Sequence, residues 1–148
     1  MNEHNLYDVA EVEITYRHSP NLMQRPKIES TIDAVKIIIE VEDMKKNIDY
    51  KELFYSVYLN QSGKVLSVCK VSEGTTINCL INIRQILQSA LLQNATGLIV
   101  IHNHPSGDCY PSEQDIAMTK RIKDAASLFD IKLLDSIIIS SYDYYSIV

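Results

Sequence analysis

The chain has 148 residues, of which 46% are hydrophobic and 22% charged, and its formal net charge is −5. These values are ordinary for one globular domain with a single core. No apolar run reaches the ~18–20 residues that a membrane-spanning helix needs, and the polar, acidic start from Met1 to Asp8 has no pattern of a secretory or transit signal. We therefore expect a cytoplasmic, single-domain protein without a membrane partner.

Two further features of composition limit the function. No block of Lys or Arg forms the basic stripe with which DNA-binding proteins neutralise phosphates, so direct nucleic-acid binding is not expected. Folding could still gather Arg17, Arg25 and Lys27 into a small basic patch. The cysteines are odd in number and too far apart for a paired thiolate motif, which predicts reduced, mostly buried thiols. They are Cys69, Cys79 and Cys109.

The chain begins with a segment in which apolar and polar residues alternate, from Val9 to Tyr16. Alternation with a period of two predicts a half-exposed strand. An irregular stretch with two prolines follows and continues to Ser30. We expect residues 1–30 to be a lead-in that packs on the same domain as residues 31–148.

Three later segments have helical patterns. Ser30 can cap a helix with Asp33 three residues later, although the run from Val35 to Val41 is rich in β-branched residues. In the other two segments, apolar residues recur at helical spacing and predict one buried face each. These residues are Leu80, Ile83, Leu87 and Leu91 in the first segment, and Met118, Ile122, Ala125, Ala126 and Phe129 in the second.

The remaining apolar segments have strand patterns. Turn residues 61–63 separate two of them, which predicts a hairpin, and a short continuous apolar run predicts a strand that is covered on both faces. The expected strands are 53–59, 65–71, 97–101, 132–140 and 144–148. Because strands and helices interleave, a sheet with helices packed on it is the expected architecture.

The segment richest in chemical groups follows the expected buried strand. His102 and His104 are two residues apart, and in an extended backbone such residues point to the same side. Pro105 disfavours the helical conformation for His104 and supports that geometry. Two imidazoles are therefore directed at one point.

Asp115 supplies a third group. Ser112 is a natural N-cap, so Asp115 falls at the third helical position, on the same face as Met118. An unpaired carboxylate on an apolar face is unfavourable, and a cation shared with His102 and His104 would resolve this. Two histidines and one carboxylate, with a position left for water, are typical of catalytic zinc. Mononuclear iron oxygenases use the same ligand types, and the Ser112–Asp115 spacing alone needs no metal.

The spacing His102-x-His104, seven residues, Ser112, two residues, Asp115 resembles the JAMM signature of the JAB/MPN metallohydrolases. The longer wording, His-Asn-His-Pro-Ser-Gly-Asp and then Pro-Ser-x-x-Asp, is similar to the bacterial RadC family over roughly residues 50–148. The resemblance implies a cytidine-deaminase-like α/β/α sandwich with a mixed sheet. It also implies zinc held by His102, His104 and Asp115.

The resemblance assigns roles to two further residues. Glu52 matches the glutamate that takes a proton from the metal-activated water, and Ser112 matches the serine that hydrogen-bonds the oxyanion. The implied activity is cleavage of a peptide or isopeptide bond in an unknown peptide or protein substrate. Without the resemblance, Glu52 would be interpreted as a solvated acid at the start of a strand.

The chain departs from the family at Ser136, where members usually carry histidine after the aspartate that is here Asp135. Whether this changes activity depends on the role of that histidine. Asp135 could orient an imidazole ligand, or it could be an acid at a strand edge. The tyrosines at 142, 144 and 145 are expected to pack on the sheet rather than to bind a ligand.

A non-catalytic alternative remains open: a metal-stabilised interaction module associated with DNA repair or processing proteins, as the family's name suggests. A nucleobase deaminase is disfavoured, because those enzymes carry Pro-Cys-x-x-Cys and this chain has no such motif. The position of Glu52 discriminates between the hydrolase and the interaction module, since a hydrolase needs this residue within reach of the metal. A homodimer through an exposed strand edge is also conceivable.

Overall fold

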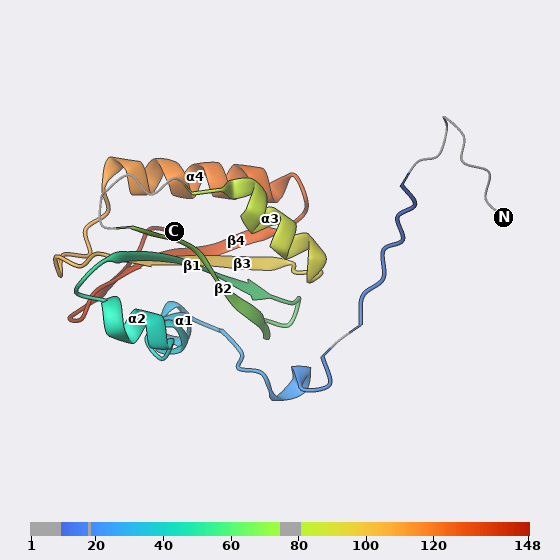
Figure 1. Ribbon diagram of the computed structural model, residues 1–148, viewed down its shortest axis with the longest axis horizontal. Coiled ribbons are helices and arrows are strands. Elements are labelled where there is room, and N and C mark those ends of the chain that lie inside the picture. Colours follow the sequence, from blue (N-terminus) through green and yellow to red (C-terminus); the bar gives the residue numbers. More distant parts are fainter. Residues whose placement is uncertain (1–9, 18, 75–80) are drawn as a thin grey trace.

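The computed structural model describes residues 10–17, 19–74 and 81–148 (Figure 1). Its helices are η1 (Leu22–Gln24), α1 (Thr31–Ile38), α2 (Glu42–Asn47), α3 (Ile83–Leu92) and α4 (Glu113–Ser127). Its strands are β1 (Glu52–Leu59), β2 (Val65–Gly74), β3 (Gly97–Asn103), β4 (Lys132–Ile139) and β5 (Tyr144–Ser146). The strands form one five-stranded sheet in the order β2-β1-β3-β4-β5.

Helices cover the sheet on both faces, with α1 and α2 on one side and α3 and α4 on the other (Figure 1). The central strand β3 is buried along its whole length, as the continuous apolar run from Gly97 to Ile101 predicts. The sheet is mixed, because β3 pairs in parallel with β4 while the other pairs are antiparallel. The expected α/β/α sandwich with a mixed sheet is therefore confirmed.

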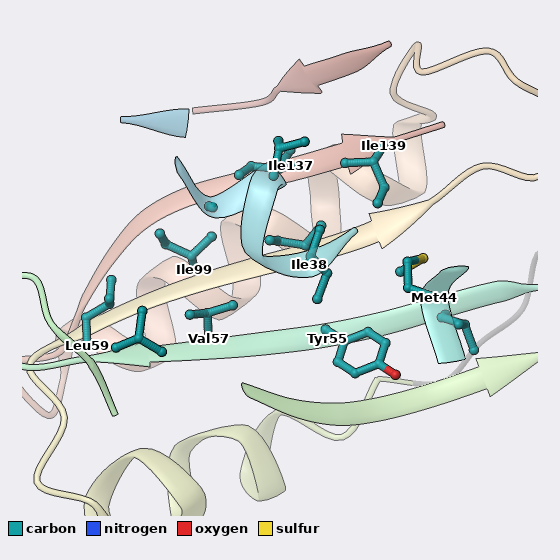
Figure 2. Packing of buried hydrophobic residues seen from close by; sticks show 13 residues of the cluster. Ile38, Met44, Tyr55, Val57, Leu59, Ile99, Ile137 and Ile139 are labelled. Carbon is teal, nitrogen blue, oxygen red and sulfur yellow. The ribbon is translucent and has the colours of Figure 1, made fainter. Parts of the chain in front are cut away.

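The core on the α1/α2 face explains why a β-branched segment forms a helix. Ala34, Val35 and Ile38 of α1 are buried against the sheet, where Ile99 and Ile137 face them (Figure 2). Full burial of each large aliphatic side chain stabilises the fold by ~1.5–3 kcal/mol. That gain exceeds the few tenths of a kcal/mol by which β-branched residues disfavour a helix. The capping box predicted from Ser30 and Asp33 is also present.

Strand directions bring several chain segments to one end of the sheet. β1 runs antiparallel to β3, in a register that pairs Phe54 with His102, so the start of β1 lies beside the end of β3. The loop after β3 leads to the first turn of α4, which packs over β4. This end of the sheet therefore holds His102, His104 and Asp115 near Glu52.

The predicted N-terminal strand is wrong for the residues that the structure describes. Residues 10–17 form no strand, and Val12 and Ile14 are 80% and 92% exposed. The first residues of this segment extend away from the folded body (Figure 1), whereas residues 15–17 line a surface cavity together with Val65 and Leu92. Alternation makes a segment suited to a sheet, but these residues pair with no strand, and it is Lys27 that bridges Lys64, the residue before the edge strand β2. The boundary at residue 30 stays a prediction.

The buried faces of two helices were predicted with errors. In α3 the buried residues are Ile86, Leu87 and Ala90, while Leu91 is exposed and Leu80 lies outside the described residues. Phe129 follows the end of α4 and is also exposed. Leu91 lies beside the buried Ala90 at the rim of the buried face, and Phe129 lies beyond the last helical residue, where the helical repeat no longer sets its direction.

Three smaller expectations have mixed outcomes. Cys109 is buried and Cys69 is partly buried, both as free thiols, whereas Cys79 lies outside the described residues. Tyr142 is 87% exposed, so the expectation that it packs on the sheet is wrong. The β4–β5 turn projects it past the sheet edge, where its ring lies over Gly107. Tyr144 and Tyr145 are partly exposed on the short edge strand β5.

The predicted basic patch forms in part: Arg17 and Arg25 line one surface cavity of about 390 Å³, whereas Lys27 pairs with Glu29 instead. Within the described ranges, no helix is long and apolar enough to span a membrane.

Candidate metal centre

Two histidines and one aspartate converge where β3 ends and α4 begins. The Nε2 atoms of His102 and His104 are 3.3 Å apart. Each of them lies 3.2 Å from one oxygen of the Asp115 carboxylate. The three side chains each offer a ligand atom, and these atoms all lie within 4.8 Å of one another. The group predicted from the sequence is therefore assembled and could hold a metal ion.

Local structure places each of these groups. His102 belongs to β3 and points to the α3/α4 face, on the side of the sheet where Val100 is buried. His104 follows the strand, and its backbone N–H donates to the carbonyl of Ile139, which keeps the chain extended beside β4. The α4 helix starts with Ser112 as its N-cap, so its third residue, Asp115, faces the imidazoles.

Asp115 is held as a carboxylate. Burial raises its pKa, but hydrogen bonds from His102, His104 and the backbone N–H of Ser112 together outweigh burial and hold the pKa well below its ordinary value. The hydrogen bond to Asp115 in turn raises the pKa of His104. Protons and a metal ion would therefore compete for the imidazole nitrogens of this group.

A hydrogen bond selects the nitrogen that His104 can offer to a metal, whereas His102 is supported by ring stacking. Nδ1 of His104 lies 2.8 Å from the carbonyl oxygen of Asp108, which can only accept, so Nδ1 carries a proton and Nε2 is left for a ligand bond. The ring of His102 stacks on Phe54 at 5.6 Å between centroids, and its buried Nδ1 has no hydrogen-bond partner among the described residues. Stacking on Phe54 therefore supports the side of His102 that faces away from Asp115, while its Nε2 contacts the Asp115 carboxylate.

Glu52 adds a second carboxylate beside this group. Its Oε1 lies 4.0 Å from Nε2 of His102. Burial raises the pKa of Glu52, while the nearby His102 and His104 lower it and Asp115 raises it, with a net increase. The antiparallel register explains the contact, because Glu52 lies on the same face of β1 as Phe54, which is paired with His102. Glu52 is thus a half-buried carboxyl group beside the ligand group, not a fully solvated acid.

Ser112 makes two hydrogen bonds with Asp115, and neither of them uses its hydroxyl proton. Its Oγ accepts from the backbone N–H of Asp115 at 3.0 Å, and its own N–H donates to Oδ2 of Asp115 at 3.0 Å. This reciprocal capping box ties the start of α4 to the candidate ligand. The hydroxyl proton is not used by the cap and remains available to another acceptor.

Asp135 does not orient an imidazole. Its carboxylate accepts hydrogen bonds from the hydroxyls of Thr31 and Ser146, each at 2.6 Å, and from the backbone N–H of Ser136. The proposed orienting role is wrong, because the side chain faces α1 and β5, away from the face that carries His102. Asp135 instead joins α1, β4 and β5.

Ser136 lies on the other face of β4. Its hydroxyl is 2.8 Å from that of Thr119, which itself donates to the backbone carbonyl of Asp115 at 2.9 Å. Because the single proton of Thr119 is used in that bond, Ser136 donates to Thr119. At the position where the family usually has histidine, this chain therefore has a hydroxyl that helps to seat α4 below the site.

Sequence reasoning missed the role of Asn103, which lies between the two histidines. Its side chain is completely buried and points to the face opposite to theirs. Its amide makes three hydrogen bonds to backbone groups of Ile48, Lys51 and Leu53. An amide in a fully buried strand is a signal that could have drawn attention to it, since buried polar groups need partners.

The fold and this group of residues define a class: an α/β/α domain with a His-His-Asp group at the end of its central strand. The model of the RadC-like JAB domain family matches residues 28–148, and the chain belongs to this family. A UPF0758 protein of Flavobacterium johnsoniae is 36% identical over 141 residues, which cover 95% of this chain and 60% of that protein.

Two other relatives show the same partial coverage. A UPF0758 protein of Desulforudis audaxviator is 41% identical over 97 residues, which cover 66% of this chain and 42% of the relative. One of Actinobacillus pleuropneumoniae is 31% identical over 137 residues, which cover 93% of this chain and 61% of the relative. The chain thus spans less than two thirds of the length of each of these relatives.

Proposed function

We propose that this protein is a zinc-dependent hydrolase that cleaves a peptide or isopeptide bond. The observation that carries the proposal is the position of Glu52, whose carboxylate lies 4.0 Å from the Nε2 atom of His102. A site that only stabilises the fold needs ligands and no further base. A carboxylate of raised pKa beside the ligand group is what proton transfer near neutral pH requires.

The distances among the donor atoms support zinc as the metal. Zn–N and Zn–O bonds of ~2.0–2.1 Å in a tetrahedron place neighbouring ligand atoms about 3.3 Å apart. The Nε2 atoms of His102 and His104 are 3.3 Å apart, which matches this value, and each lies 3.2 Å from a different oxygen of the Asp115 carboxylate. Imidazole nitrogens with one carboxylate also suit zinc better than magnesium or calcium, which prefer oxygen ligands. His102, His104 and Asp115 would hold the ion.

When bound, zinc supplies Lewis-acid polarisation of a carbonyl and acidifies water toward a pKa of ~7. Glu52 then accepts the proton of the attacking water and returns it to the leaving amine, a role for which its half-buried position and raised pKa are suited. The hydroxyl of Ser112 donates its free proton to the oxygen on which negative charge develops. Asp108 keeps His104 in the required tautomer through its backbone carbonyl.

The alternative is a metal-stabilised interaction module without turnover, associated with proteins of DNA repair or processing. It shares the ligands but gives no role to Glu52. The contact between Glu52 and His102 therefore favours the hydrolase, whereas the net charge of −5 favours a peptide or protein over a nucleic acid as the bound molecule.

Metal content tests the ligands first. Untagged wild-type protein is expected to contain about one zinc per chain by mass spectrometry, the usual stoichiometry of such a site. Asp115→Asn is expected to lose the metal, whereas Asp124→Asn, the same change at an exposed residue of α4, is expected to keep it. A wild-type protein that takes up no zinc would refute the proposal.

Turnover is tested separately with zinc-loaded protein and a library of quenched fluorescent peptides. The wild type is expected to cleave members of the library, and Glu52→Gln to keep its zinc while losing cleavage. Equal cleavage by wild type and Glu52→Gln would remove the base from the mechanism. Full zinc occupancy with no cleavage of peptides or isopeptide-linked proteins would favour the interaction module.

A further inference from the structure

The segment that carries Glu52 lies beyond the part of β1 that pairs with β3, although Glu52 and Leu53 still pair with Gly74 and Glu73 of β2. The paired residues of β1 and β3 end with Phe54 and His102. Continuing the same antiparallel register would place Leu53 opposite Asn103, and Glu52 opposite His104. Glu52 is thus the residue at which β1 begins, and on its β3 side this segment lacks the backbone ladder that holds the rest of the strand.

The side chain of Asn103 replaces the missing backbone partner. Its Oδ1 accepts from the backbone N–H of Leu53 at 2.7 Å. Its Nδ2 donates to the backbone carbonyls of Ile48 and Lys51, each at 2.9 Å. The orientation of the amide is unambiguous, because a flipped amide would set its oxygen against two carbonyl oxygens and its nitrogen against an N–H.

These bonds surround Glu52 on both sides. The carbonyl of Lys51 precedes it and the N–H of Leu53 follows it, and both are fixed to one amide that is itself completely buried. Asn103 is also the residue between His102 and His104. Its backbone thus belongs to the segment that carries the two imidazoles, while its side chain is hydrogen-bonded to the segment that carries Glu52.

We infer that Asn103 is a positioning residue, which sets the distance between the Glu52 carboxylate and the metal ligands. The inference rests on the proposed function, because it gives Glu52 the role of the base. Only a side chain with one acceptor and two donors can satisfy the three backbone groups. Serine or alanine would be too short, and aspartate would turn two donors into acceptors that face carbonyl oxygens.

Asn103→Asp and Asn103→Ala test the inference, with Asn60→Ala as the control. Asn60 accepts hydrogen bonds from the backbone N–H groups of Ser62 and Lys64, but it lies at the opposite end of β1. Both Asn103 variants are expected to keep their zinc. Crystal structures of the zinc-loaded variants should show the Glu52 carboxylate displaced from its place beside His102, while the control leaves it there.

Kinetics on a peptide that the wild type cleaves provide the second readout. Displacement of the base by about 1 Å is expected to lower kcat about 100-fold at unchanged KM. The Asn103→Asp variant should be no slower in a Glu52→Gln background than Glu52→Gln alone, since both changes act through the same carboxylate. A Glu52 carboxylate that stays in place in both Asn103 variants, or an additive loss in the double variant, would overturn the inference.

Two outcomes need separate treatment. If the wild type cleaves no peptide, the proposed function fails, but the crystal structures still decide whether Asn103 positions Glu52. If neither Asn103 variant folds, hydrogen exchange in the wild type decides. The backbone N–H of Leu53 is then expected to exchange slowly because it is bonded to Asn103. Rapid exchange of that N–H would overturn the inference.

Discussion

Replacement of Ser112 separates its role in the helix cap from its proposed role in chemistry. The Oγ atom accepts from the backbone N–H of Asp115 at 3.0 Å, and the hydroxyl proton is the one proposed to reach the substrate. Ser112→Ala removes both the acceptor and the donor. Ser112→Gly also removes the hydroxyl, but glycine is tolerated at an N-cap. Ser112→Thr keeps both groups.

The three variants have different expected stabilities. Loss of an N-cap side chain costs about 1 kcal/mol when alanine replaces serine, but only a few tenths of a kcal/mol when glycine does. The N–H of residue 112 still donates to Asp115 Oδ2 in every variant, so half of the capping box survives. For a domain of this size, 1 kcal/mol lowers Tm by about 3 °C. Ser112→Ala should therefore melt about 3 °C below the wild type, and the other variants closer to it.

The expected activities follow a different order. Removal of one donor to a developing oxyanion lowers kcat about 10²–10³-fold. Ser112→Ala and Ser112→Gly should therefore lose activity alike, despite their different stabilities, and Ser112→Thr should retain most of it. Thermal unfolding is followed by circular dichroism on the metal-free protein, so that ligand binding does not shift Tm. Kinetics are measured on the zinc-loaded protein.

Two results would refute this reasoning. If Ser112→Gly is as active as the wild type, the hydroxyl has no part in the chemistry and Ser112 is only a cap. If Ser112→Ala has the same Tm as the wild type, the hydrogen bond from the N–H of Asp115 to residue 112 contributes nothing to the stability of the fold.

Three further predictions concern pH and packing. Zinc affinity should fall steeply from about pH 7 to pH 5, because Asp115 raises the pKa of His104 and protons then compete for Nε2; an affinity equal at both pH values in a competition titration would contradict this. Gly97→Ala should destabilise the protein by about 1 kcal/mol in urea unfolding, since its Cβ would lie 3.3 Å from Leu59 Cβ and 2.9 Å from the end of the Leu134 side chain; unchanged stability would show that both neighbours give way freely. Asp135→Leu should destabilise the protein by ~1–3 kcal/mol, because it leaves the buried N–H of Ser136 and two half-buried hydroxyl donors unpaired; a neutral result would show that these donors reach water.

The ligand group could be predicted from the sequence because its geometry is local. Side chains two residues apart in an extended chain share one side, which fixes His102 relative to His104. A serine cap sets the first turn of a helix, which fixes the direction of Asp115. The hairpin and the central strand follow in the same way, from turn residues and from a continuous apolar run.

Other features depend on contacts between distant segments. Glu52 reaches His102 only because β1 pairs antiparallel with β3 in a particular register, and no pattern near residue 52 encodes that register. Asp135 could have served an imidazole, yet the face of β4 from which it projects meets Thr31 of α1 instead. Alternation in the lead-in predicts a strand, but residues 10–17 pair with no strand of the sheet. Local periodicity determines which way a side chain points, whereas the packing of the whole chain determines what it meets there.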